Sequence, residues 1–96
     1  MMVLVCYDVS IVSNNGSKRL RKVAKELKNH GQRVQNSVFE LNLDWSTFLK
    51  VKNNLNKIID DKVDSLRFYY LGNKWNGKIE HIGAKTTYNT EGILLI

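Results

Sequence analysis

Apolar residues recur with a period of two in several short stretches of the chain, and this period predicts strands. Residues 2–9 are apolar and β-branched with hardly any polar alternation, which is typical of a strand buried on both faces. Residues 33–43 are also extended, and we expect two short strands there with a break near Asn36. Residues 63–71 alternate, so that Leu66, Phe68 and Tyr70 share one side of a further strand.

In the C-terminal part of the chain the stretches with a recognisable pattern are shorter. Residues 72–77 have the composition of a turn and include Trp75. A short strand candidate at 78–83 and a final apolar stretch at 92–96 follow this turn.

Two other segments, 17–29 and 46–59, place their apolar residues at helical spacing. In the first segment these residues are Leu20, Val23, Ala24 and Leu27. We expect Asn15 or Ser17 to cap the start of the first helix and Gly31 to end it in the left-handed conformation. Asp44 or Ser46 offers an N-cap for the second helix.

The order strand, helix, strand pair, helix, strand predicts an α+β domain of the ferredoxin-like βαββαβ type. In that fold both helices lie on one face of an antiparallel sheet, here with an extra C-terminal strand. Residues 1–96 are too few for two separate cores, so we expect one domain. Because residues 2–9 are apolar on both sides, we expect a homodimer in which a second copy covers the bare face of the sheet. The stretch 92–96 is expected to pair along a sheet edge of its own subunit or of the partner.

The net charge of the chain indicates which kind of molecule it binds. The chain has 15 Lys and Arg residues against 9 Asp and Glu residues, a formal net charge of +6. This excess favours a polyanionic partner, nucleic acid before anionic lipid. A single cysteine excludes a disulfide scaffold and favours a cytoplasmic protein. No apolar run reaches the roughly 18 residues of a membrane-spanning helix, so no membrane association is expected.

Asp8 is the main candidate for chemistry, because a carboxylate at the end of an apolar strand must be capped, paired or bound to a cation. Two interpretations are open. The carboxylate could accept hydrogen bonds from the turn that begins at Ser10. Alternatively, two copies of Asp8 in a symmetric dimer could hold one Mg²⁺ or Mn²⁺ ion together with backbone carbonyls or Ser10 and water. Such an ion would polarise a phosphodiester or activate water.

Basic residues surround the apolar stripe of the first helix, and these are Lys18, Arg19, Arg21, Lys22, Lys25 and Lys28. They form a candidate track for nucleic-acid phosphates, which Arg33 could extend, or else a solvated charged surface. Tyr7 and Phe39 fit core packing, whereas Trp75 in its polar turn is a candidate for stacking on bases. Cys6 fits a buried thiol of the core, and His30 and His81 fit structural roles.

Several blocks of the sequence carry a resemblance to a known family. The most specific block is GQRVQNSVFE at 31–40. Supporting blocks are YDV at 7–9, KRLRKVA at 18–24, Leu66-Arg67 with Tyr70-Leu71-Gly72, HIGAK at 81–85 and the apolar end. Together they resemble the small CRISPR-associated endonucleases that partner the CRISPR integrase, especially the short bacterial members. The loop 14–17 and the pair Glu91-Gly92, which lacks a proline often found there, depart from that pattern.

The resemblance implies a ferredoxin-like homodimer with Asp8 at the subunit interface as the magnesium ligand. It also implies a C-terminal strand that can extend across the dimer. By position, Tyr7, Asp8, Arg33 and Phe39 match residues that the family uses at or beside its active site. Family members sit between integrase dimers and hold double-stranded DNA, and some are metal-dependent nucleases on RNA or double-stranded DNA.

We therefore expect a nucleic-acid-binding scaffold of CRISPR spacer acquisition that carries a magnesium-dependent endonuclease site. A stand-alone, toxin-like ribonuclease on the same fold and a non-catalytic binding module are the alternatives. Binding to the integrase distinguishes the first from the toxin, and metal-dependent digestion distinguishes an enzyme from a module.

Overall fold

A computed structural model describes residues 1–71 and 78–84 of the chain. The predicted turn at 72–77, with Trp75, and the predicted final stretch at 92–96 lie outside the described residues. In the described part, no helix has both the length and the apolar character needed to cross a membrane.

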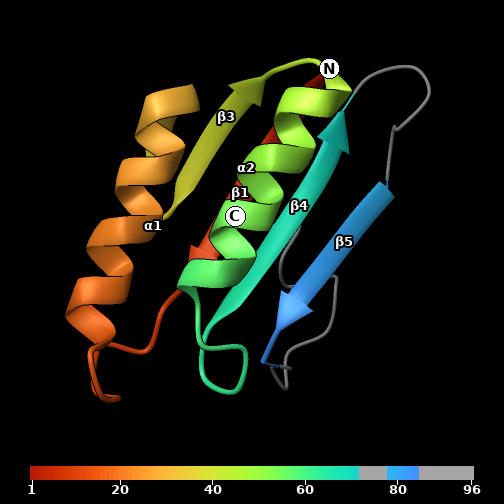
Figure 1. The fold of residues 1–96 in the computed structure, drawn as a ribbon. Coiled ribbons are helices and arrows are strands. Elements are labelled where there is room, and N and C mark those ends of the chain that lie inside the picture. Colours follow the sequence, from red (N-terminus) through yellow and green to blue (C-terminus); the bar gives the residue numbers. More distant parts are fainter. Residues whose placement is uncertain (72–77, 85–96) are drawn as a thin grey trace.

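The described residues form a five-stranded antiparallel sheet and two helices (Figure 1). In chain order the elements are β1 (Met2–Asp8), α1 (Gly16–His30), β2 (Gly31–Gln35), β3 (Val38–Asn42), α2 (Trp45–Ile58), β4 (Ser65–Leu71) and β5 (Lys78–Gly83). The strand order in the sheet is β2-β3-β1-β4-β5, so the N-terminal strand is central. This topology confirms the predicted ferredoxin-like fold, and β5 is an added strand beside β4.

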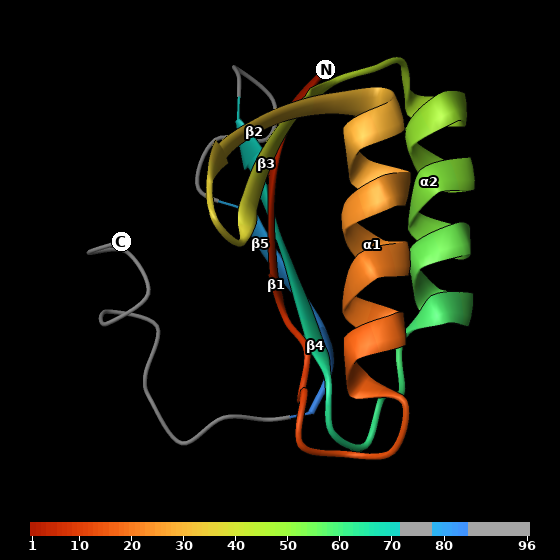
Figure 2. The ribbon, with the colours of Figure 1, turned by 90° about the vertical axis from the view of Figure 1, so that its left-hand side faces the viewer.

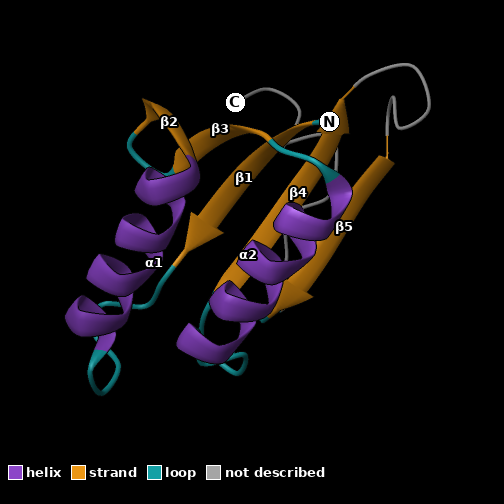
Figure 3. Cartoon of the chain, turned by 45° about the horizontal axis from the view of Figure 1, so that its top comes forward, coloured by secondary structure: helices purple, strands orange, loops and turns teal. Residues whose placement is uncertain are grey.

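Both helices cover the same face of the sheet (Figures 2 and 3). Alternation along β1 turns Val3, Val5 and Tyr7 toward the helices, where each is at most 5% exposed. The facing core residues are Val23 and Leu27 of α1 and Phe48, Val51 and Leu55 of α2. The other side chains of β1 therefore point to the opposite side of the sheet, called here the open face because neither helix covers it.

The structure confirms the N-cap predicted for the second helix but not a side-chain N-cap by Asn15 for the first. Asp44 caps α2, since its side chain accepts a hydrogen bond of 3.0 Å from the backbone N–H of Thr47. At the start of α1, Asn15 takes the left-handed conformation (φ 62°), but its side chain makes no capping hydrogen bond.

The prediction that Gly31 ends α1 in the left-handed conformation is wrong, because its φ of −159° is extended. Gly31 is instead the first residue of β2. A Cβ atom at this position would collide with the Leu41 side chain and the carbonyl oxygen of Glu40 on β3. Glycine is therefore needed for the close approach of two strands, and not for a positive φ.

The start of β4 is also later than the alternating pattern suggests, at Ser65 and not at residue 63. The backbone N–H groups of Val63 and Asp64 both donate to the carbonyl oxygen of Asp60, at 3.0 and 2.8 Å. These bonds close a turn that uses the first residues of the predicted strand.

Candidate metal and nucleic-acid sites

Asp8 is the last residue of β1, and its side chain is exposed on the open face opposite Ser65 of β4. Within residues 1–71 and 78–84, no group donates a hydrogen bond to the Asp8 carboxylate. The turn that follows does not use it, because the backbone N–H of Ser10 donates to Asp64 Oδ1 at 2.9 Å. The carboxylate is thus available for an external ligand, and the turn-capping interpretation of Asp8 is wrong.

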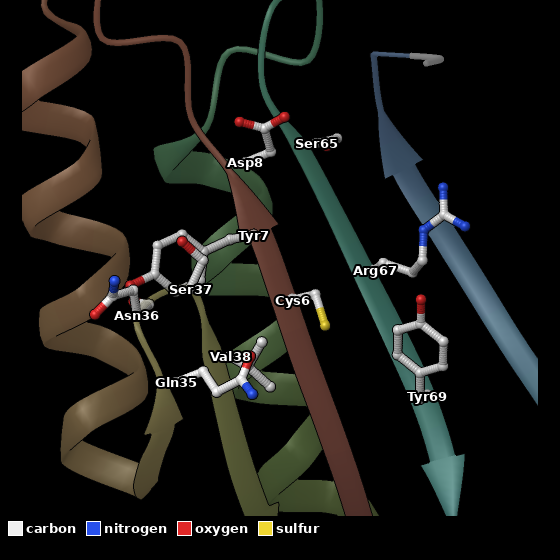
Figure 4. A pocket seen from close by; sticks show the side chains of 10 residues that line it. All are labelled: Cys6, Tyr7, Asp8, Gln35, Asn36, Ser37, Val38, Ser65, Arg67 and Tyr69. Carbon is white, nitrogen blue, oxygen red and sulfur yellow. The ribbon is translucent and has the colours of Figure 1, made fainter. Parts of the chain in front are cut away.

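A hollow of about 580 Å³ lies beside Asp8 on the open face (Figure 4). Cys6 and Asp8 of β1 and Arg67 and Tyr69 of β4 line its floor and one side. The turn between β2 and β3, residues 35–38, forms another wall. Cys6 was expected in the core but is partly exposed here, and burial raises the pKa of its thiol while Arg67 opposes the shift.

Tyr7, Phe39 and Arg33, the other residues matched to the family's active site, lie together on the helix side of the sheet. The Tyr7 ring centroid is 6.1 Å from that of Phe39, and the Arg33 guanidinium carbon lies 5.1 Å from the Phe39 centroid. Tyr7 Oη donates to the backbone oxygen of Asn36 at 3.1 Å. Tyr7, which also lines the hollow, thus holds the turn that walls it, whereas the Asp8 side chain points to the opposite face.

A divalent metal needs more ligands than the described residues of one subunit provide. Among the described residues there is no group of three or more His, Cys, Asp or Glu side chains placed to hold an ion. The available donor is the hard carboxylate oxygen of Asp8, a type that Mg²⁺ prefers together with water. Asp8 therefore fits a magnesium ligand only as part of a shared site, to which a second subunit would add another carboxylate.

The basic residues of α1 divide into two groups. Lys18, Arg21, Lys22 and Lys25 are exposed on the helix, as a phosphate-binding surface requires. Arg19 is different, because its Nε donates to Asp64 Oδ2 at 2.7 Å and its Nη2 donates to Ser13 Oγ at 2.5 Å. The structure thus corrects the interpretation of Arg19 from a phosphate ligand to an ion-pair partner within the fold.

Asp64 is a residue that the sequence analysis missed. Its side chain is 0% exposed, and it accepts hydrogen bonds from the backbone N–H groups of Ser10 and Asp60 and from Arg19. Burial alone would raise the pKa of this carboxyl, but these hydrogen bonds outweigh burial and hold the pKa below its usual value. One signal was available, since Asp64 stands directly before an apolar strand as Asp8 stands at the end of one.

Comparison with known proteins identifies the family to which the chain belongs. A family model described as "CRISPR associated protein Cas2" matches residues 1–79. The chain belongs to the Cas2 family. This result confirms the resemblance found in the sequence blocks.

Two relatives match along almost their whole length. A Cas2 of Chlorobaculum tepidum, named a CRISPR-associated endoribonuclease, is 49% identical over 96 residues, which are 100% of both chains. A Cas2 of Halalkalibacterium halodurans, named a CRISPR-associated endonuclease, is 52% identical over 95 residues, 99% of each chain. The crystal structure of Streptococcus pyogenes Cas2 at pH 6.5 is 55% identical with a TM-score of 0.70, covering 78% of this chain and 90% of that one.

Proposed function

We propose that this Cas2 chain is a nucleic-acid-binding subunit of CRISPR spacer acquisition, a partner of the integrase that carries a magnesium-dependent endonuclease site. The observation that carries the enzymatic part is the Asp8 carboxylate, which is exposed beside a hollow and accepts no hydrogen bond from the described residues. A carboxylate in this state can bind a cation without first losing an internal partner.

A homodimer through the open face would complete the site. This face carries the partly exposed side chains of Leu4, Cys6, Val38, Tyr69 and Ile79. Covering them with a second copy removes apolar surface from water, and a twofold axis near the hollow would bring the two Asp8 carboxylates together. Both described helices, α1 and α2, lie on the other face, which supports that mode of association (Figure 2).

Nuclease activity is supported by the names of the relatives, one an endoribonuclease and the other an endonuclease. In the proposed site Asp8 of each subunit holds the ion, and the wall at 35–38 limits the space beside it. Mg²⁺ bound there would supply Lewis-acid chemistry, polarising the phosphodiester and lowering the pKa of a water ligand. The exposed lysines of α1 supply the charge that retains the polyanionic substrate, whether RNA or double-stranded DNA.

Two aspartates of this chain give a matched test of the endonuclease site. Asp8→Asn and Asp61→Asn each remove one negative charge from an exposed side chain, but only Asp8 lines the hollow. Purified proteins are incubated with labelled duplex DNA or single-stranded RNA, with Mg²⁺, with Mn²⁺ or with a chelator. We expect metal-dependent cleavage by the wild type and Asp61→Asn and none by Asp8→Asn. Equal cleavage by all three proteins, or cleavage in the chelator, would remove Asp8 from the mechanism.

The integrase partnership needs a separate experiment. A tagged copy of this chain is used to capture the integrase encoded in the same genome, and light scattering reports the oligomeric state of the free protein. A stable complex and a dimeric free protein are expected. No complex, together with growth arrest when the chain is expressed alone, would favour the toxin-like ribonuclease instead.

A further inference from the structure

Arg67 of β4 lines the same hollow as Asp8, yet the two side chains do not form an ion pair (Figure 4). In the register of the sheet, Asp8 lies opposite Ser65 and Cys6 lies opposite Arg67, so Asp8 and Arg67 are diagonal neighbours on the open face. The Cβ atoms of diagonal neighbours are about 7 Å apart, a distance that an arginine side chain can span. A carboxylate and a guanidinium thus share the hollow without contacting each other.

The Arg67 side chain is directed by β5 instead. Arg67 lies opposite His81 in the register of β4 and β5, and its Nη2 lies 3.0 Å from His81 Nδ1. His81 Nε2 in turn lies 2.8 Å from the backbone oxygen of Ala84, which fixes the imidazole ring. The charge of Arg67 still acts inside the hollow, since it opposes the rise that burial causes in the pKa of the Cys6 thiol.

The hollow has one cationic side chain among its described lining residues, and that residue is Arg67. Arg33, the arginine matched to the family's active site, does not line the hollow. Its guanidinium carbon lies 5.1 Å from the centroid of the Phe39 ring on the helix side of the sheet. A positive charge beside Asp8 is therefore supplied by Arg67 and not by Arg33.

We propose that Arg67 is a catalytic residue of the endonuclease site, where its guanidinium binds a non-bridging oxygen of the phosphodiester beside Asp8, and that His81 is its positioning residue. This inference rests on the proposed endonuclease function and adds a phosphate-binding group to the same site. Because a guanidinium has five N–H donors in a rigid fork, Arg67 can hold His81 and phosphate oxygens at the same time.

The chemistry of hydrolysis gives such a group a role. A water oxygen forms a bond to phosphorus, and the bond from phosphorus to one sugar oxygen breaks with its electron pair. The proton that the water loses balances the proton that the departing sugar oxygen gains. Negative charge is spread over the non-bridging oxygens in the transition state. The carboxylate of Asp8 repels that charge, whereas a guanidinium held in place by His81 stabilises it without reorganisation.

The first test is the steady-state cleavage of labelled duplex DNA and single-stranded RNA with Mg²⁺. Arg67→Ala should lower kcat by about 10² to 10³ and change KM little, as for the loss of one donor to a transition-state oxygen. Lys50→Ala is the matched control, because it removes one positive charge from an exposed position on α2, on the other side of the sheet (Figure 2). Lys50→Ala should keep the wild-type kcat.

The role of His81 is tested by a pair of variants. His81→Ala removes the acceptor for Arg67 and should lower kcat with little change in KM. His81→Asn places an amide oxygen near the position of Nδ1, and this oxygen can accept from Arg67. Recovery of most of the lost kcat in His81→Asn is expected for a positioning residue.

The second test needs neither metal nor a substituted protein. The Arg67 Nε–H resonance of the wild type is followed by NMR in the presence of a chelator during titration with a thymidine dinucleotide, which carries one phosphodiester. We expect the resonance to shift at millimolar dinucleotide. Thymidine at the same concentrations offers the same base and sugar without the phosphodiester, and it should leave the resonance in place.

The outcomes separate this inference from the function on which it rests. If the wild type cleaves and requires Asp8 but Arg67→Ala and Lys50→Ala have the same kcat, Arg67 is not catalytic. An Arg67 resonance that the dinucleotide leaves unmoved would overturn the phosphate contact even if Arg67→Ala does not fold. A kcat that is lost in His81→Ala and not recovered in His81→Asn would remove the positioning role. If the wild type cleaves neither nucleic acid with Mg²⁺ or Mn²⁺, the endonuclease function itself fails and the inference falls with it.

Discussion

Arg19 Nε lies 2.7 Å from Asp64 Oδ2, and this ion pair joins the first turns of α1 to the residue that precedes β4. The same carboxylate accepts the backbone N–H of Ser10, two residues after Asp8. The loop between β1 and α1 is therefore fixed by a residue from another part of the chain. As a consequence, the Asp8 carboxylate at the end of β1 is left without a partner among residues 1–71 and 78–84.

Asp64→Asn should destabilise the protein strongly, because it leaves Arg19 without its counter-charge and weakens two backbone hydrogen bonds. Removing one partner of a buried pair costs about 3 kcal/mol. For a chain of this length that loss corresponds to a fall of about 15 °C in the thermal midpoint. Thermal unfolding monitored by circular dichroism, at one protein concentration, measures the change, with the exposed Asp61→Asn as the control.

The same variant changes the acid sensitivity of the fold. Since the pKa of Asp64 is lowered in the folded chain, its contribution is complete above the unfolded value, about pH 4, and is lost as the pH falls through the folded value. The wild type should therefore lose stability more steeply than Asp64→Asn below about pH 4. Parallel stability profiles of the two proteins would show that Asp64 is not the titrating group.

Asp8→Asn, unlike Asp64→Asn, should have little effect on the stability of the fold. The Asp8 side chain is exposed and accepts no hydrogen bond from the described residues, so its replacement removes no internal contact. We expect a change in unfolding free energy within about 0.5 kcal/mol, as for surface substitutions in general. Chemical denaturation measures this value, and a loss comparable to that of Asp64→Asn would mean that Asp8 has a structural role.

Much of the fold was predictable from the sequence because local patterns determine it. The continuous apolar run at 2–9, the period of two at 63–71 and the helical stripe of Leu20, Val23 and Leu27 identify the elements. The order of these elements identifies the topology. Gly31 was misinterpreted because a glycine after a helix serves a left-handed cap as readily as a close strand contact. Only the pairing of β2 with β3 shows which requirement holds.

The candidate site was predictable only in part, because its decisive contacts are distant in sequence. Asp8 was identified from its position at the end of an apolar strand, and the structure leaves its carboxylate accessible. The partner of Arg19 lies 45 residues away, so the sequence could not distinguish a buried ion pair from a phosphate ligand.

Tyr7→Phe should affect stability and leave most of the cleavage activity. The Tyr7 hydroxyl donates to the backbone oxygen of Asn36 on the helix side of the sheet, away from the Asp8 carboxylate. Loss of one such hydrogen bond costs about 1 kcal/mol. Phe39→Ala, which opens a cavity at a fully buried ring, should cost about 3 to 5 kcal/mol. Abolished cleavage in a well-folded Tyr7→Phe protein would instead assign the hydroxyl a chemical role.

His81 provides a prediction about protonation on the open face. Arg67 Nη2 lies 3.0 Å from His81 Nδ1, and His81 Nε2 lies 2.8 Å from the backbone oxygen of Ala84. Arginine has no acceptor, so Nδ1 must accept and the proton must reside on Nε2, which donates to Ala84. Nitrogen NMR of the protein with His81 in its neutral form should show an unprotonated Nδ1 and a protonated Nε2 at His81. In Arg67→Ala the hydrogen bond from Nε2 to the Ala84 oxygen remains, so Nε2 should stay protonated while the Nδ1 resonance shifts because it loses its donor, with His30, which faces Glu26 at 3.5 Å, as the internal reference. A proton on Nδ1 of the wild-type residue would contradict the hydrogen bond from Arg67.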